Sequence, residues 1–318
     1  MKIITVVIPT YNEESNVLNT YERVKSIFNE KLTQYDFQIL YIDNASKDNT
    51  RSVIKELCVS DNRVQAIFNN TNFGFSRSTF YGLSQAEGDA AILMYADMQD
   101  PPEIIPEFIS KWEEGYKVVV GIKSKSKENI CMYALRDLYY KILDRFSEIE
   151  HIKQFDGFGL YDASFIKELR RIKDSLPYLR GIVSELGPER GVVEYTQDIR
   201  KNGKSSFNLL KYYDVAMLGI TSSSKAVLRL AVLGGLLMSF ICIIIALLTF
   251  ILKIMNWNYY DVGTAAIITG IFFVGGIQLL FLGIIGEYIA NINSRTMHHP
   301  IVIESERINM HRKVLEDE

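Results

Sequence analysis

Residues 91–103, AILMYADMQDPPE, join an apolar run to a cluster of oxygen-bearing side chains. Asp97 and Gln99 lie two positions apart, so in an extended segment their side chains point to the same side. Carboxylate and amide oxygens are the ligands that Mg²⁺ and Mn²⁺ prefer, and such ions often bridge a carboxylate to a phosphate. Asp97 and Gln99 are therefore candidate metal ligands, and Asp100 could support them or contact a sugar. The simpler alternative is that Asp97 and Asp100 cap the helix expected after the two prolines.

Short apolar runs alternate with amphipathic stretches over residues 1–125, and this alternation is typical of an α/β domain. It predicts a mainly parallel, Rossmann-like sheet with helices on both faces. The predicted strands are residues 3–8, 37–42, 64–68, 90–95, 117–122 and 192–199. The predicted helices are residues 17–28, 49–59, 75–86, a helix begun near 101, 130–147 and 163–172.

A polar cluster follows each of the first four predicted strands. These clusters are PTYNEE at 9–14, DNASKDNT at 43–50, NNTNFG at 69–74 and ADMQD at 96–100. Ligands of such sheets bind beyond the carboxyl ends of the strands. We therefore expect the four clusters to form one site.

Composition excludes several classes of function. The formal net charge is −3 and no basic block dominates, so we expect no nucleic-acid partner. The three cysteines and four histidines have no spacing typical of a zinc site. The N-terminus lacks the long apolar run and cleavage site of a signal peptide.

Two long apolar runs near the C-terminus predict a transmembrane hairpin. Residues 230–252 carry no charge over 23 positions, and residues 262–286 contain Gln278 as their strongly polar member. At about 1.5 Å per residue, each run is long enough to cross a hydrocarbon core of about 30 Å. The alternative is a pair of buried soluble helices. Residues 253–261 would form a short external loop, and residues 287–318 a cytoplasmic tail.

Basic residues precede the first apolar run and follow the second. The positive-inside rule therefore predicts that both outer ends of the hairpin, and the N-terminal domain, lie in the cytoplasm. Residues 208–229 carry tyrosines together with Lys211 and Lys225 and predict interfacial helices, although an ordinary connector is an alternative. A cytoplasmic domain of residues 1–207, tethered to a bilayer, suggests a water-soluble donor and a lipid acceptor. A nucleotide diphosphate is anionic, so an acidic loop would bind it through a cation.

The segments VVIPTYNEESNV, YIDNASKDNT, NNTNFGFSRSTFYGLSQAEGD and YADMQDPPE, in this order, resemble the family 2 glycosyltransferases of GT-A fold. With the C-terminal hairpin, the chain is similar to the branch of dolichol-phosphate mannosyltransferases and bactoprenol (polyprenyl-phosphate) glucosyltransferases. The resemblance implies a nucleotide-sugar donor, with UDP favoured and GDP as the alternative, a polyprenyl-phosphate acceptor, and Mg²⁺ or Mn²⁺ as cofactor. It also implies an inverting displacement and a homo-oligomer in the plasma membrane of a bacterium.

The resemblance assigns roles to individual residues. The positions implied to bind the nucleotide are Pro9, Tyr11, Glu13, Asp43, Asn72, Gly74 and Arg77. Of these, the first three would line the base pocket and Asp43 would hold the base or ribose, whereas Gly74 has the alternative role of a turn that needs positive φ. The positions implied to act near the reaction are Asp97 and Gln99 on the metal, Asp100 facing the sugar, and Arg200 and Lys204 gripping phosphate. A solvated surface is the alternative for the loop that carries these last two.

The chain departs from the family pattern in two places. Tyr95 stands where many members have the first Asp of Asp-x-Asp, so a metal would lose one carboxylate. FDGFGLYD replaces a pattern resembling Gly-Asp-Phe-Arg-Leu, which puts Gly157 at the Asp, Gly159 at the Arg, and Asp156 one place early. Asp156 could act as the catalytic base, or no base is needed, because a lipid phosphate is largely dianionic at pH 7.

Two other functions compete with a polyprenyl-phosphate transferase. One is a glycosyltransferase that acts on the hydroxyl group of a polysaccharide or glycolipid; it would need a clear base. The other is a decayed transferase that binds a nucleotide at the membrane without turning it over. Tyr95 and Gly157 are the residues that raise this second alternative.

Overall fold

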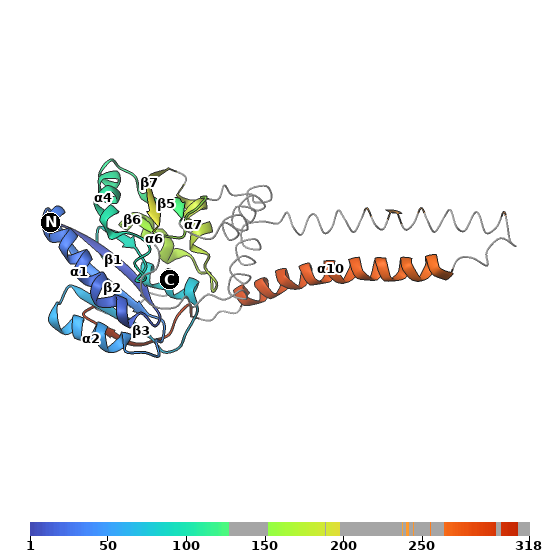
Figure 1. The fold of residues 1–318 in the computed structure, drawn as a ribbon, viewed down its shortest axis with the longest axis horizontal. Coiled ribbons are helices and arrows are strands. Elements are labelled where there is room, and N and C mark those ends of the chain that lie inside the picture. The colour runs from blue at the N-terminus through green and yellow to red at the C-terminus, as the bar shows by residue number, and fades with distance from the viewer. Residues whose placement is uncertain are drawn as a thin grey trace.

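The computed structural model describes residues 1–126, 152–187, 189–197, 264–296 and 300–310, together with a few isolated positions between 237 and 255. It comprises an α/β domain and a long helix that extends away from it (Figure 1). Several predicted features lie outside the described residues: the helix at 130–147, the loop with Arg200 and Lys204, the interfacial segment, and nearly all of the first apolar run and the external loop.

One mixed sheet of eight strands forms the centre of the described domain. The strands are β1 (Lys2–Thr10), β2 (Tyr35–Asp43), β3 (Val64–Asn69), β4 (Ala90–Leu93), β5 (Val118–Ser126), β6 (Gly159–Asp162), β7 (Arg190–Gln197) and β8 (Glu304–Ile308). Their order is β7-β5-β6-β4-β1-β2-β3-β8. β1 pairs in parallel with β2 and β4, as do β2 with β3 and β5 with β7, whereas β6 and β8 run antiparallel to their neighbours. The prediction of a mainly parallel sheet is therefore confirmed, with two antiparallel strands that the pattern did not reveal.

The helices connect these strands in the predicted alternation. They are α1 (Glu14–Lys31), α2 (Thr50–Ser60), α3 (Phe75–Ser84), the 3₁₀ turn η1 (Pro102–Ile104), α4 (Ile105–Glu113), α6 (Ala163–Arg171), α7 (Leu179–Leu186) and α10 (Thr264–Thr296). Each predicted helix that falls on described residues is present. The short α7 was not predicted.

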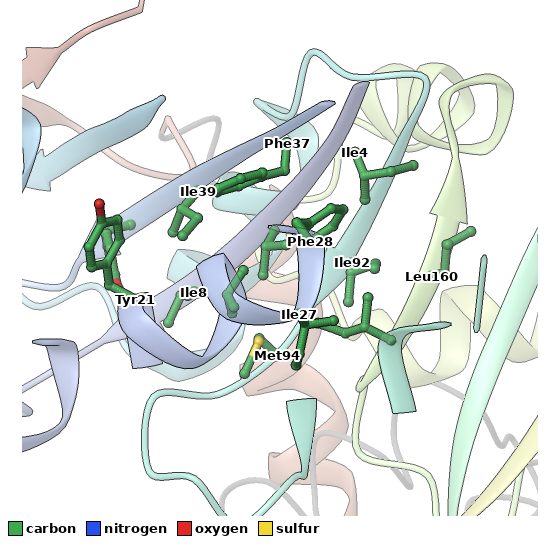
Figure 2. Close-up of a cluster of buried hydrophobic side chains, with 14 of the residues drawn as sticks. Ile4, Ile8, Tyr21, Ile27, Phe28, Phe37, Ile39, Ile92, Met94 and Leu160 are labelled. Carbon is green, nitrogen blue, oxygen red and sulfur yellow. The ribbon is translucent and has the colours of Figure 1, made fainter. Parts of the chain in front are cut away.

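The sheet buries both faces. Along β1, Ile4, Val6 and Ile8 pack on one side with residues of α1, α2 and α4, and Val7 packs on the other with residues of α3, α6 and α7. Figure 2 shows the first of these layers, where Phe28 of α1 lies among the strand residues. Alternate side chains of a strand point to opposite faces, so a continuous apolar run is what a sheet covered on both sides requires.

The chain returns to this domain after α10. β8 pairs with β3, and Asn70 donates its backbone N–H to the Ile303 carbonyl at 3.0 Å. β8, at Glu304–Ile308, therefore forms an edge strand of the α/β sheet, within the segment 287–318 that the sequence analysis expects to be a cytoplasmic tail.

Within the residues that the structure describes, no helix has the combination of length and apolar character that a membrane crossing needs. The first apolar run falls almost wholly outside those residues, and the second overlaps α10. The transmembrane hairpin therefore stays a prediction.

Candidate active site

The carboxyl ends of β1, β2, β3 and β4 lie at one edge of the sheet, because these four strands are parallel neighbours. The four polar clusters predicted to form one site follow these ends. The first two are joined directly: Asn12 donates its N–H to Ser46 Oγ at 2.9 Å and accepts from the Lys47 N–H at 2.8 Å. The Glu13 N–H similarly donates to Thr50 Oγ1 at 2.9 Å. Pro9 and Tyr11 lie half-buried beside these contacts, where the resemblance places the base pocket.

Asp43, at the end of β2, carries a carboxylate oxygen that no group of the described residues satisfies. Its side chain is fully buried, and Oδ2 accepts from Arg51 Nε at 2.6 Å and from the Ser46 N–H at 3.1 Å. Its Oδ1 is buried and has no hydrogen-bond partner in the part of the chain that the structure describes. A buried acceptor left in this state costs about 1–3 kcal/mol. A hydroxyl or N–H donor from a ligand would remove that cost, as the assigned base or ribose contact requires.

An amide network fixes the loop after β3. Asn44 donates to Asn72 Oδ1 at 3.0 Å and accepts from Asn69 Nδ2 at 3.1 Å. Asn72 Oδ1 also accepts the Gly74 N–H at 2.9 Å. Asn72 thus holds its loop by protein contacts.

Gly74 precedes α3 with φ at +86°, and a Cβ there would meet nothing within 4 Å. Backbone conformation rather than space therefore requires glycine, so the alternative of a turn with positive φ is confirmed. Arg77 lies in the first turn of α3, half-buried.

Asp97 and Gln99 form a turn after β4. The Gln99 N–H donates to Asp97 Oδ1 at 3.2 Å, and Met98 between them has φ at 60°. The expectation that these two residues sit in an extended segment is therefore wrong. The capping alternative is also wrong, because neither η1 nor α4 has a side-chain hydrogen bond at its N-cap.

The donor set at this turn is small. Among the described residues, no group of three or more His, Cys, Asp or Glu side chains is placed to hold a metal ion. Asp97 and Gln99 supply hard oxygen atoms that fit Mg²⁺ or Mn²⁺, which keep several non-protein ligands. Phosphate oxygens of a bound ligand would have to complete such a site.

A largely buried cluster of charged groups follows this turn. Asp100 is 1% exposed and accepts from the Tyr195 hydroxyl at 2.6 Å. Lys123 Nζ lies 2.6 Å from Asp156 Oδ2 and 3.9 Å from Asp100 Oδ1. The structure therefore brings the predicted residues Asp100 and Asp156 to the same lysine.

The two carboxyl groups differ in their pKa. Burial raises the pKa of Asp100 to about 8, and repulsion from Asp156 adds to the rise. Lys123 opposes this rise, but at 3.9 Å it is too far for a hydrogen bond. Burial also disfavours the charge on Asp156, yet Lys123 and Arg180 outweigh it and lower the pKa of Asp156. Carboxyl groups whose pKa values are pushed apart are typical of catalytic sites.

Lys123 and Tyr195 belong to this cluster but are not among the residues predicted from the sequence. Lys123 follows directly on the predicted strand 117–122, so the rule applied to the first four strands would have found it. Tyr195 lies inside the predicted strand 192–199, where an aromatic residue is ordinary, and it gave no signal of its own.

Comparisons with known proteins give consistent matches. The sequence model named Glycosyl transferase family 2 matches residues 5–170. An uncharacterized glycosyltransferase, YkcC of Bacillus subtilis (strain 168), is 33% identical over 312 residues, covering 98% of this chain and 96% of the relative. A bactoprenol glucosyl transferase of Shigella phage SfV is 32% identical over 306 residues, covering 96% and 99%.

A solved structure of glucosyl-3-phosphoglycerate synthase from Mycobacterium tuberculosis, in complex with Mn²⁺, UDP-glucose and phosphoglyceric acid, superposes with a TM-score of 0.49. It is 14% identical and covers 69% of this chain and 78% of that one. A likeness this distant adds nothing to the assignment.

Proposed function

The chain belongs to glycosyl transferase family 2, and from this premise we propose that it transfers a sugar from a nucleotide-diphosphate sugar to polyprenyl phosphate at the cytoplasmic face of a membrane. The bactoprenol glucosyl transferase of phage SfV, similar over nearly its whole length, supports a polyprenyl-phosphate acceptor. We favour a UDP-sugar as the donor and a homo-oligomer as the assembly.

The observation that carries the proposal is the largely buried cluster of Asp100, Lys123 and Asp156 beside the oxygen donors of Asp97 and Gln99. A donor bound at Asp43 would direct its diphosphate along the same sheet edge, towards the end of β4. Asp97 and Gln99 would hold a divalent cation there, and such an ion neutralises charge on a leaving diphosphate. Arg200 and Lys204, outside the described residues, would bind phosphate from the donor or the lipid.

The acceptor chemistry requires little from a base. A phosphate oxygen of the lipid forms a bond to the anomeric carbon, and the bond from that carbon to the diphosphate breaks with its electron pair leaving on the nucleotide. A dianionic phosphate gives up no proton in this single inverting step. The protein's contribution is alignment of the two reactants and stabilisation of charge.

The position of β8 supports a membrane hairpin. β3 precedes the two apolar runs and β8 follows them, yet these strands pair in one sheet. Both ends of the apolar region are therefore on the same side of any membrane that it crosses. Two crossings satisfy this condition, with the α/β domain and both termini in the cytoplasm.

The test uses purified full-length protein, polyprenyl phosphate and a panel of radiolabelled nucleotide sugars, with and without Mg²⁺ or Mn²⁺. We expect a lipid product that mild acid cleaves, because a glycosyl phosphate is acid-labile. Asp97→Ala should abolish transfer. Asp36→Ala, at the opposite end of β2, is the matched control and should not change it. An acid-stable product would indicate a hydroxyl acceptor, and nucleotide binding without diphosphate release would indicate a decayed enzyme.

A further inference from the structure

Two tyrosine hydroxyl groups hold consecutive carbonyls of the loop before β6. Tyr95, just after β4, donates to the Asp156 carbonyl at 2.8 Å. Tyr161, within β6 and fully buried, donates to the Gly157 carbonyl at 2.7 Å. We name these two phenols the tyrosine clamp. Because β4 and β6 are paired strands, the clamp fixes the loop to the centre of the sheet.

Gly157 fits this clamp and a larger residue would not. Its φ is +116°, a conformation that side chains disfavour. A Cβ at this position would lie 2.9 Å from the Tyr95 hydroxyl oxygen and 3.3 Å from Leu93 Cδ2. The hydroxyl of Tyr95 therefore requires a residue without a side chain at position 157. The two departures from the family pattern are separate in sequence but linked in the structure.

Gly159 excludes a side chain for a different reason. A Cβ there would lie 2.3 Å from the Val119 carbonyl oxygen of the neighbouring strand β5. Neither Gly157 nor Gly159 can therefore present a charged group. The charges near this loop come instead from Asp156, one residue earlier, and from Lys123 on β5.

The clamped backbone sets the direction of Asp156. Its Oδ1 accepts the Phe158 N–H at 3.1 Å and its Oδ2 lies 2.6 Å from Lys123 Nζ. The charged and titratable groups that act on Asp156 include Lys123 from β5 and Arg180 from α7. A shift of the 156 carbonyl would move this carboxylate away from Lys123.

We propose that Tyr95 and Tyr161 are positioning residues, whose hydrogen bonds to the 156 and 157 carbonyls hold the Asp156 carboxylate against Lys123 in the active site. This inference rests on the proposed function. It gives Tyr95 a role other than metal binding. Where many family members have a metal-binding carboxylate, this chain has a phenol that positions the carboxylate of Asp156. The two departures then indicate a rearranged site rather than a decayed one.

The test compares Tyr95→Phe and Tyr161→Phe with Tyr41→Phe in the full-length protein. Tyr41 is a matched control, since its buried hydroxyl also donates to a backbone carbonyl, that of Val17 at 3.1 Å, on the α1 side of the sheet. The first readout is the rate at which acetic anhydride modifies Lys123, measured by mass spectrometry. We expect severalfold faster modification in the two clamp variants and no change in Tyr41→Phe.

The second readout is the kinetics of sugar transfer. Because misplacement of a reacting group by about 1 Å can lower a rate by about 100-fold, we expect kcat in Tyr95→Phe to fall by about 10- to 100-fold. The KM for the donor should stay within about twofold, because Tyr95→Phe removes only the hydroxyl and keeps the ring that contacts Phe75, next to Gly74. Tyr41→Phe should retain the wild-type kcat.

Gly157→Ala tests the link between the two departures. Its effect on Lys123 modification should be smaller in the Tyr95→Phe background than in the wild type, because the phenol oxygen that its Cβ meets is gone. Equal effects in both backgrounds would overturn the coupling.

The labelling experiment needs no turnover, so it decides the inference even if the wild-type protein transfers no sugar to the lipid. In that case the proposed function fails, and the rate of Lys123 modification alone decides whether the tyrosine clamp positions Asp156. Unchanged Lys123 reactivity in both clamp variants would overturn the inference, as would equal changes in Tyr41→Phe. An active wild type with unchanged kcat in Tyr95→Phe would also overturn it.

Discussion

The unpaired Oδ1 of Asp43 predicts a specific loss in donor binding. In Asp43→Asn the side chain keeps its size but loses its charge. A hydrogen bond to a charged group contributes about 1.5–3 kcal/mol, so donor affinity should fall by about 10- to 100-fold. Calorimetric titration with nucleotide diphosphate measures this directly.

The control for this prediction is Asp61→Asn, which removes a partly buried carboxylate on the turn between α2 and β3. It should bind nucleotide as the wild type does. Equal affinity in Asp43→Asn and the wild type would show that the orphaned oxygen is not a ligand contact.

Asp61 itself predicts a pH dependence of stability. Its carboxylate accepts from Arg63 Nη2 at 2.7 Å and from the Tyr21 hydroxyl at 2.9 Å. The hydrogen bond from Arg63 lowers the pKa of Asp61, against the effect of burial. A lowered folded-state pKa contributes stability above the unfolded-state pKa of about 3.9, and this contribution is lost as the pH falls towards the folded-state value.

Asp61→Asn should therefore reduce the free energy of unfolding at pH 7 by about 1–2 kcal/mol, and the difference should shrink as the pH falls from about 5 to about 3. Denaturant unfolding of the full-length protein in detergent, monitored across this range, measures the difference. A difference that stays constant with pH would contradict the assignment.

Single residues differed in how well the sequence predicted them. Asp43, Asp97 and Asp100 were found because polar groups directly after buried strands are conspicuous. The relation between Tyr95 and Gly157 was not found, because residues so far apart in the chain meet only through the pairing of β4 and β6. The sequence showed each residue as a departure, and only the paired strands show why the two occur together.

At the scale of elements, β8 predicts that a distant segment stabilises the domain. The Arg307 guanidinium donates to Glu304 and, at 3.0 Å, to Gln85 Oε1, while Tyr81 donates to Glu304 at 2.8 Å. The Arg307 and Glu304 side chains are 10% and 11% exposed. Arg307→Ala would leave a nearly buried carboxylate without its cation and should reduce the free energy of unfolding by about 2 kcal/mol.

Hydrogen exchange, followed by mass spectrometry, measures this effect where it should occur. Amides of β3 and β8 should exchange faster in Arg307→Ala, while those of β1 stay protected at the sheet centre. The double variant Glu304→Gln with Arg307→Ala should recover part of the protection, because no charge is then left unpaired. Unchanged exchange in β3 would mean that β8 does not support it.

The strands and helices of the first 122 residues could be predicted because apolar runs and helical spacing mark them directly. β6 could not, because GLYD is four residues long and its neighbours in the sheet are distant in sequence. β8 could not either: ESERI carries three charges, and only its pairing with β3 distinguishes it from a polar tail. Local pattern thus revealed the parallel core, and long-range pairing added the antiparallel strands.

For the whole molecule, the pairing of β3 with β8 constrains the predicted transmembrane hairpin. A strand before the apolar region and a strand after it share one sheet. Positions in these two parts of the chain must therefore be accessible to a reagent from the same side of the membrane. Val59 and Ile303 are suitable reporters, with 86% and 48% of their surface exposed. The predicted external loop, residues 253–261, should be accessible from the other side.

Single cysteines at Val59, Ile303 and Asn258, in a chain whose three native cysteines are replaced by alanine, test this arrangement. A membrane-impermeant thiol reagent should label Asn258→Cys in intact cells and should label Val59→Cys and Ile303→Cys only in inverted vesicles. Opposite accessibility at positions 59 and 303 would contradict the sheet itself, because β8 could not then reach β3. If all three positions are labelled only in inverted vesicles, the sheet stands and the hairpin is wrong. The polyprenyl phosphate would then have to reach the site from a membrane that the chain does not cross.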